Sequence, residues 1–197
     1  LIGSYILEEL LNIPVKVEYA SEFRYRETAV NGDSVVICVS QSGETADTLA
    51  AIRKAKEKGA LTLGIINVVG SSIARETHCG VYIHAGPEIG VASTKAFTTQ
   101  LTGLILLAMS IAKSLDIDKA LRKNLAKELR SLPAAIEKTL KLSDEILKIV
   151  PNIADKDNAL FLGRGMFFPI VQEGALKLKE ISYIHAEAYP AGELKHG

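Results

Sequence analysis

The stretch from Ser34 to Gly59 constrains the fold of this chain more than any other part of the sequence. It begins with the β-branched run Val35–Val39, continues with the small polar residues 40–43 (SQSG), and ends in a helical pattern over 44–58. A short buried strand that turns directly into a helix is the unit from which α/β folds are built. Such a turn places hydroxyl groups at a helix N-terminus, where unpaired backbone N–H groups attract anions. We therefore expect an anion site at this turn.

Apolar runs separated by helical patterns continue this arrangement through the first half of the chain. Leu61–Ile66 and Val81–His84 are predicted strands, and the alternating residues Val15–Tyr19 predict a half-buried strand before them. Near-continuous apolar strands are typical of a parallel sheet that helices cover on both faces. We therefore predict an α/β fold with three layers, αβα, around a parallel sheet. The expected helices lie at 1–11, at 44–58, at 73–76 after a possible cap at Ser71 or Ser72, and over the apolar run up to Lys113.

The pattern changes after residue 115. Two charged amphipathic helices are predicted between Ile117 and Val150, separated at 131–133 (SLP) because proline interrupts a helix. A strand over Asn158–Leu162 and a helix over 169–184 then repeat the strand-to-helix order. We predict a first α/β unit over 1–115. A helical linker and the start of a second, incomplete unit are predicted over 116–197, which makes both ends of the chain resemble truncations.

Composition excludes several classes of partner. Lys plus Arg equals Asp plus Glu at 23 each, so no overall field favours nucleic acid or a membrane surface. The apolar run Leu101–Ala112 is shorter than the roughly 20 residues that span a bilayer, so we interpret it as a buried core helix. No signal peptide is apparent at Leu1. Cys38 and Cys79 are too few for a disulfide framework, which fits a reducing cytoplasm, and Cys38 is expected to be buried.

The turn after the first strand of this stretch offers several hydroxyl groups but no lysine. Neither GxxxxGK[ST] nor GxGxxG is present, which argues against nucleoside triphosphates and dinucleotides. A monophosphate held by hydroxyl and amide groups is the sharper hypothesis. The alternative is that Ser42 and Thr45 only cap the helix, with Glu44 and Asp47 matching its dipole. Residue chemistry alone leaves the two alternatives about equally supported.

A second set of polar residues shares one helix face near the C-terminus. Glu173, Lys177 and Glu180 lie at positions i, i+4 and i+7. The simplest interpretation is a surface ladder of ion pairs, and spacing alone favours it. The alternative is an acid–base site in which a desolvated Glu180 moves a proton while Lys177 holds substrate oxygens. His78, His84 and His185 have no spaced partners and are interpreted as structural, and no metal-binding set is visible.

Four runs of residues resemble a known family. They are SQSGETADTL in the turn, ASEFRYR at 20–26, EIGVASTKAFTTQL at 88–101, and the long block from Glu173 to Gly197. The turn resembles the phosphosugar-binding loop of sugar isomerase (SIS) domains. Together the runs resemble the isomerase region of the glutamine–fructose-6-phosphate aminotransferase family. The resemblance implies a pair of flavodoxin-like SIS folds, each with a five-stranded parallel sheet.

The resemblance also implies roles for individual residues. The family's 6-phosphate site falls on the turn, its sugar-lining loop on 91–93, and its proton-transfer residues on the C-terminal block. In the family the matching histidine assists ring opening in the active site of the neighbouring subunit, which implies a homodimer. The implied phosphate ligands are Ser40, Gln41, Ser42 and Thr45, the sugar-lining residues are Val91 and Ser93, and the catalytic residues are Glu180, Lys177 and His196.

The implied activity is the conversion of fructose 6-phosphate and glutamine-derived ammonia to glucosamine 6-phosphate, an early step of amino-sugar biosynthesis in the cytoplasm. No cofactor, metal, nucleic acid or membrane is expected, and the implied partner is a glutaminase domain of the same full-length chain. The family's first strand, its glutaminase domain and its C-terminal lysine fall outside residues 1–197. We therefore expect this chain alone to bind the phosphosugar without completing amination. The competing hypotheses are a non-catalytic phosphosugar sensor and a stand-alone aldose–ketose phosphate isomerase.

Overall fold

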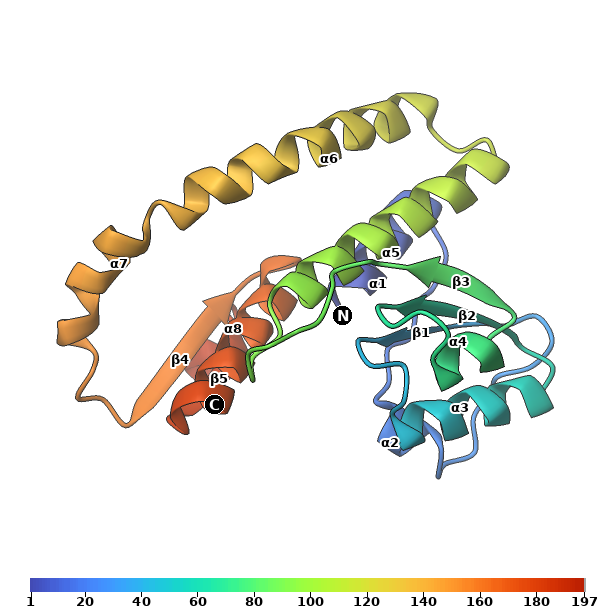
Figure 1. The fold of residues 1–197 in the computed structure, drawn as a ribbon, viewed down its shortest axis with the longest axis horizontal. Coiled ribbons are helices and arrows are strands. Elements are labelled where there is room, and N and C mark those ends of the chain that lie inside the picture. Colours follow the sequence, from blue (N-terminus) through green and yellow to red (C-terminus); the bar gives the residue numbers. More distant parts are fainter. Residues whose placement is uncertain (197) are drawn as a thin grey trace. The chain divides into compact units, whose positions relative to one another are not determined.

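The computed structural model describes residues 1–196 and divides them into two compact units (Figure 1). One unit comprises residues 6–108, and the other comprises residues 1–5 and the chain from Met109 onward. Each unit is described by itself below. The predicted boundary after residue 115 stays a prediction, and Gly197, the last residue of the predicted second unit, lies outside the described residues.

Three parallel strands form the sheet of the first unit. They are β1 (Val35–Ser40), β2 (Leu61–Ile66) and β3 (Cys79–Tyr82), arranged in the order β1-β2-β3. Val35 pairs with Leu61, and Leu63 pairs with Cys79. Because the strands are parallel, their carboxyl ends lie at the same edge of the sheet, which is where open α/β sheets bind ligands.

Helices cover both faces of this sheet, as the apolar strands predicted. On one face of the sheet lie α3 (Ala46–Glu57) and α4 (Ser72–Glu76) (Figure 1). On the other face lies α5 (Lys95–Ser114), whose Gly103 sits so close to Ile65 that an added Cβ would come within 3.2 Å of it. Successive residues of a strand point to opposite faces, so Ile65 meets α5 while Ile66 joins the core on the opposite face. That core comprises Cys38, Ile52, Ile66 and Ile73.

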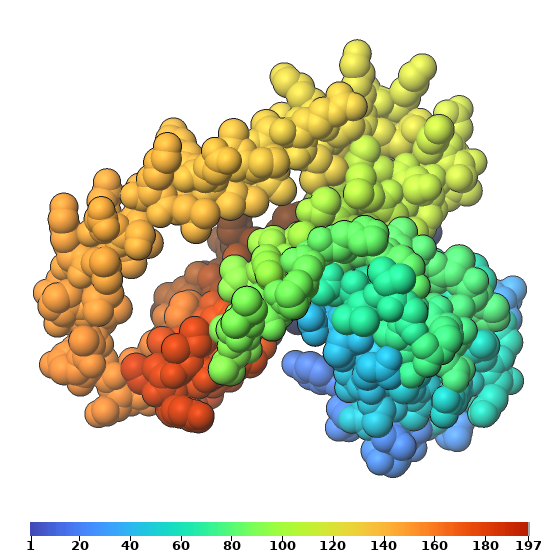
Figure 2. All heavy atoms as spheres, in the orientation of Figure 1, coloured from blue at the N-terminus to red at the C-terminus, as the bar shows by residue number. Residues whose placement is uncertain are grey.

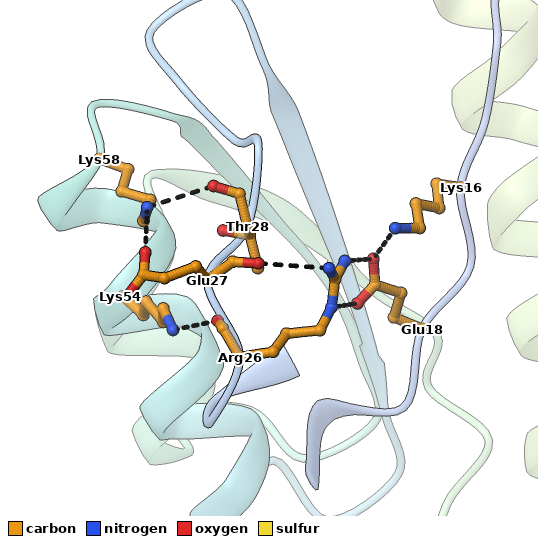
Figure 3. A network of polar contacts seen from close by, with 7 residues as sticks. All are labelled: Lys16, Glu18, Arg26, Glu27, Thr28, Lys54 and Lys58. Carbon is orange, nitrogen blue, oxygen red and sulfur yellow. Dashed lines mark hydrogen bonds and ion pairs between the residues drawn. The ribbon is translucent and has the colours of Figure 1, made fainter. Parts of the chain in front are cut away.

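The expected strand at Val15–Tyr19 is wrong. Residues 12–19 form a loop outside the sheet, followed by the short helix α2 (Ala20–Phe23). The alternating pattern has another cause, since Lys16 and Glu18 pair with each other and Glu18 also binds Arg26 (Figure 3). An alternation that places charges together for ion pairing looks the same in sequence as one that buries a strand face.

The third strand begins and ends two residues earlier than predicted, at Cys79–Tyr82 instead of Val81–His84. His84 ends the extended conformation because its backbone adopts a positive φ of 48°. The predicted burial of Cys38 is confirmed, and burial raises the pKa of its thiol to about 11.

The second unit contains a parallel pair of strands, β4 (Asn158–Gly163) and β5 (His185–Pro190), connected by α8 (Phe167–Ser182). Gly174 lets α8 approach Phe161 of β4, where an added Cβ would lie 3.2 Å from the ring. The expectation of a single strand is wrong. The strand that was not predicted is β5. Its sequence, HAEAYP, carries small alanines on the side toward α8 instead of the β-branched residues that usually mark a strand.

Two further helices, α6 (Lys119–Leu140) and α7 (Ser143–Ile149), have no buried residues, and their side chains project outward in Figure 2. The predicted break at 131–133 is wrong, because α6 continues through Pro133 and ends only before α7. An exposed helix tolerates proline better than a buried one, since water can bind the carbonyl that loses its N–H partner. The remaining elements are α1 (Ile2–Leu11) and the 3₁₀ turns Val150–Asn152 and Leu194–His196.

By length and composition alone, α5 could cross a membrane. Core helices of soluble proteins pass the same test of length and composition. Its buried residues are Ala96, Gly103, Leu104, Ala108 and Ala112, so the helix predicted to be a buried core helix is buried along one side only.

Candidate functional site

The turn between β1 and α3 is built around a glycine that no other residue could replace without strain. Gly43 has a φ of 67°, and a Cβ at this position would lie 2.0 Å from the Oγ of Ser71. Its N–H donates to the Oγ of buried Ser40 at 3.0 Å. The closed turn leads the chain from the end of β1 directly into the first turn of α3.

Two hydrogen bonds fasten this turn to α4. The carbonyl of Gly43 accepts from the N–H of Ile73 at 2.9 Å, and Oε1 of Glu44 accepts from the N–H of Ser72 at 2.7 Å. The bonding with Ser72 lowers the pKa of Glu44. The carboxylate of Glu44 therefore caps α4 and does not compensate the dipole of α3.

The other acidic residue of the turn is neutralised. Asp47, in the first turn of α3, accepts a hydrogen bond from Nη1 of Arg24 at 2.5 Å, and this bond raises the pKa of Arg24. Arg24 follows α2, in the run ASEFRYR. Both carboxylates that could repel an anion at the N-terminus of α3 are thus engaged elsewhere, which leaves its partial positive charge for a ligand.

The hydroxyl groups of the turn are distributed around this N-terminus. Thr45 is the N-cap residue of α3, yet its side chain makes no capping hydrogen bond, and it is exposed. The Oγ of Ser42, also exposed, accepts from the N–H of Glu44 at 3.2 Å. The simple capping alternative therefore does not describe Thr45, whose hydroxyl faces solvent beside the free amides of the first turn.

A cavity of about 490 Å³ adjoins the turn at the carboxyl edge of the sheet. This volume lies within the usual range of small-ligand sites, about 300–1,000 Å³. Among the predicted phosphate ligands Gln41 lines it, and so does His84, which the sequence assigned to a structural role. The complete lining is Gln41, Asn67, Val68, His84, Gly86, Pro87 and Glu88.

Sequence reasoning missed Asn67 and Glu88 as parts of this site. Their only signal was position, since Asn67 directly follows β2 and Glu88 lies in the connection after β3. The two predicted sugar-lining residues do not line the cavity. Ser93 instead donates its hydroxyl to Oε2 of Glu88 at 3.1 Å, and the side chain of Val91 is exposed.

The predicted stripe on α8 is present in the second unit. Nζ of Lys177 lies 2.6 Å from Oε2 of Glu180 and 3.4 Å from Oε1 of Glu173. Burial lowers the pKa of Lys177, but the hydrogen bond to Glu180 and the charge of Glu173 outweigh it, so the net shift is upward. Lys177 is therefore an ammonium group shared by two carboxylates. The side chains of Lys177 and Glu180 are 24% and 35% exposed, so both are partly shielded from solvent.

The last predicted catalytic residue, His196, lies in the 3₁₀ turn Leu194–His196 and is exposed. A neighbouring polar row on β5 was not predicted. Glu187 accepts a hydrogen bond from the hydroxyl of Tyr189 at 2.9 Å and lies 3.4 Å from Nε2 of His185. Within residues 1–196, no group of three or more His, Cys, Asp or Glu side chains could hold a metal ion.

Comparison with known proteins connects both polar regions to one family. The family model described as "SIS domain" matches residues 1–110 and 152–197. The glutamine–fructose-6-phosphate aminotransferase [isomerizing] of Chlorobaculum tepidum is 59% identical over the whole chain, which spans 32% of that relative. The chain thus spans about a third of the length of the curated relatives it matches.

Solved structures agree with this relationship. The C-terminal domain of glucosamine-fructose-6-phosphate aminotransferase from Francisella tularensis superimposes with a TM-score of 0.96 at 48% identity, over all of this chain and 56% of that one. A structure from Thermotoga maritima described as glucosamine-6-phosphate deaminase has a TM-score of 0.79 at 26% identity, over all of this chain and 58% of that one.

Proposed function

Because the chain belongs to the SIS domain family, we propose that it is the phosphosugar-binding isomerase portion of a glutamine–fructose-6-phosphate aminotransferase. The observation that carries this proposal is the 59% identity over the whole chain to a relative of that name. The reaction would convert fructose 6-phosphate and glutamine-derived ammonia to glucosamine 6-phosphate, with the ketose-to-aldose isomerisation as this region's share. The open N-terminus of α3 supplies a physical reason for a phosphate anchor.

In this proposal the turn binds the 6-phosphate. The amides of the first turn of α3 and the hydroxyls of Ser42 and Thr45 donate hydrogen bonds to phosphate oxygens. Ser40 can donate its hydroxyl hydrogen while still accepting from Gly43, because a hydroxyl both donates and accepts. Gln41 joins the phosphate site to the cavity, where the sugar would lie, with Val91 and Ser93 on the adjoining loop.

The acid–base chemistry is assigned to the stripe on α8. Glu180, held beside the Lys177 ammonium, takes the proton from one of the two carbons C1 and C2 and returns it to the other. Lys177 stabilises the negative charge that develops on the substrate oxygen during enolisation. Such electrostatic stabilisation of the transition state is usually the largest single contribution to the rate enhancement of an enzyme. His196 assists ring opening, and we propose that it does so in the site of a second subunit of a homodimer.

The remaining organisation is proposed on the same basis. Residues 116–197 form a helical linker and the start of a second SIS unit, and a glutaminase domain in the same full-length protein supplies the ammonia. We also propose that the protein works in the cytoplasm. The relatives' greater length supports the presence of further domains.

The proposal is tested by titrating fructose 6-phosphate and glucosamine 6-phosphate into the full-length protein in a calorimeter and by assaying turnover of the Glu180→Gln variant. We expect saturable binding in both proteins and a loss of at least 100-fold in turnover for the variant, in the range of general acid–base contributions. Glu57→Gln, on the exposed side of α3, is the matched control. Binding without turnover in the wild type would instead support a phosphosugar sensor. Absence of saturable binding would reject both functions.

A further inference from the structure

The connection between β3 and α5 borders the cavity but lacks backbone support. Within residues 1–196, no backbone–backbone hydrogen bond involves positions 84–93. Two positive φ angles, at His84 and Gly86, turn the chain sharply where it leaves the sheet. A loop of this kind moves freely unless side chains fix it.

Asn67 fixes the first part of this loop. Its side chain is 9% exposed and reaches from the end of β2 to the turn after β3. Oδ1 accepts from the N–H of Ala85 at 2.8 Å, and Nδ2 donates to the carbonyl of Gly86 at 2.8 Å. The amide thus replaces the pair of backbone hydrogen bonds that a longer β3 would make.

Glu88 fixes the second part. Its Oε2 accepts from the hydroxyl of Ser93 at 3.1 Å and from the N–H of Ala96, in the first turn of α5, at 3.2 Å. One carboxylate oxygen therefore joins the middle of the loop to its end and satisfies an amide that the helix itself leaves unpaired. The side chain is half-buried in the cavity wall.

We propose that Asn67 and Glu88 are positioning residues that hold the 84–94 loop as one wall of the phosphosugar cavity. This inference rests on the proposed function and adds to it the groups that preorganise the sugar-binding side of the site. A prearranged loop does not lose conformational freedom on binding, so the two side chains act mainly on affinity. The proton-transfer step, assigned to other residues, is left unchanged.

The test compares truncation with conservative replacement in the full-length protein. We expect Glu88→Ala and Asn67→Ala to raise the KM for fructose 6-phosphate roughly 10-fold, as for about 1.4 kcal/mol, with kcat within about 2-fold of the wild type. Glu88→Gln keeps a carbonyl oxygen as acceptor and restores most of the lost affinity. Asn67→Asp turns a carboxylate oxygen toward the Gly86 carbonyl, so it behaves like alanine.

A second measurement needs no substrate. Amide hydrogen exchange of residues 85–96 is expected to accelerate in both alanine variants and to stay slow in Glu88→Gln. Glu57→Ala, which removes an exposed carboxylate from α3 of the same unit, is the control and is expected to change neither measurement.

The outcomes separate this inference from the proposed function. If the wild type fails to bind the phosphosugar, the proposed function is wrong. If the wild type binds but the alanine variants keep its KM, with or without faster exchange, the positioning role is rejected while the function stands. If an alanine variant does not fold, the two conservative variants, Asn67→Asp and Glu88→Gln, decide the question. A wild-type KM in Asn67→Asp, or a KM raised 10-fold in Glu88→Gln, overturns the inference.

Discussion

At the scale of single residues, anion binding at the N-terminus of α3 depends on the partners of two nearby carboxylates, those of Glu44 and Asp47. A helix N-terminus that carries its own acidic residues is already compensated and attracts a phosphate only weakly. Here Glu44 is drawn to α4 and Asp47 to Arg24. In the proposed phosphate site, Arg24 therefore acts by neutralising Asp47 and need not touch the phosphate.

This view predicts the effect of removing Arg24. The Arg24→Gln variant leaves the Asp47 carboxylate unpaired beside the bound phosphate, so we expect the Kd for fructose 6-phosphate to rise roughly 3- to 10-fold. Adding Asp47→Asn to this variant removes the unpaired charge and is expected to restore binding. Calorimetry at low and high salt measures both effects, and the defect is expected to shrink at high salt.

A matched control is Arg53, which lies on α3, the helix that carries Asp47. Arg53 pairs with Glu76 at 2.6 Å, away from the turn, so Arg53→Gln loses an equivalent ion pair without freeing a charge at the site. Equal weakening of binding by both arginine variants would contradict the assigned role of Arg24.

The turn glycine allows a second prediction in which backbone and steric effects are separated. Gly43 and Gly70 both have positive φ, but an added Cβ meets Ser71 at the first and open space at the second. Gly70→Ala is expected to cost about 1 kcal/mol of unfolding free energy, the ordinary penalty of a left-handed residue. Gly43→Ala is expected to cost about 3 kcal/mol, because the structure around it must also shift. Urea unfolding measures both, and equal costs would mean that the turn is looser than described.

At the scale of elements, a network of charged side chains attaches the loop before β1 to α3 (Figure 3). Lys54 donates to the backbone carbonyls of Arg24 and Arg26, and Lys58 donates to the carbonyl of Thr28 at 3.2 Å. Arg26 in turn binds Glu18 through two nitrogens. The loop is thereby held so that Arg24 reaches the first turn of α3.

The network predicts a specific dependence of stability on pH. Hydrogen bonds from Arg26 and then from Lys16 lower the pKa of Glu18 from 4.5 to about 2. A carboxyl with a lowered pKa stabilises the folded state above its unfolded pKa, and this contribution disappears as the pH falls toward the folded pKa. Glu18→Gln is therefore expected to cost about 0.5 kcal/mol at pH 7, a value reduced for exposure to solvent. The difference from wild type is expected to shrink between pH 4.5 and 2 in urea titrations, and a constant difference would contradict the assignment.

The elements that sequence reasoning missed or misplaced have two different physical causes. Strands β1 and β2 were predictable because burial on both faces requires continuous apolar residues. In β5 the side toward α8 accepts only small residues, so Ala186 and Ala188 replace the usual β-branched residues. The break predicted in α6 has another cause: the helix is exposed, so it can contain Pro133 without ending there. Local patterns therefore predict elements best where large apolar side chains cover both faces, and miss them where close packing admits only small residues or where the element faces water.

At the scale of the whole molecule, the candidate site was predictable to the extent that it lies on contiguous motifs. The turn after β1 and the Glu173–Lys177–Glu180 stripe are each encoded within a few residues, and the structure contains both, while their roles in binding and proton transfer stay predictions. Asn67, Glu88 and Arg24 belong to the same unit as the turn but come from separate segments, and only the folded sheet brings them to its carboxyl edge. No spacing rule relates them, so the structure was needed to find them.

The proposed homodimer gives the last prediction, which concerns two copies of the chain. If His196 acts in the site of the neighbouring subunit, each site takes Glu180 from one subunit and His196 from the other. Glu180→Gln and His196→Ala then remove residues that different subunits contribute to a site. Mixed after dissociation, the two inactive full-length variants form heterodimers in which one site carries both substitutions and the other carries none. Random pairing makes half of the dimers mixed, so we expect recovery of about a quarter of wild-type activity.

The amount recovered distinguishes the alternatives. If Glu180 and His196 of the same copy formed one site, every site in the mixture would carry one substitution, and activity would stay at the level of the separate variants. Glu180→Gln mixed with Lys177→Ala is the matched control, because both residues lie on the same face of α8 in one chain. No recovery is expected from that pair, so recovery there would show exchange or contamination and not a shared site.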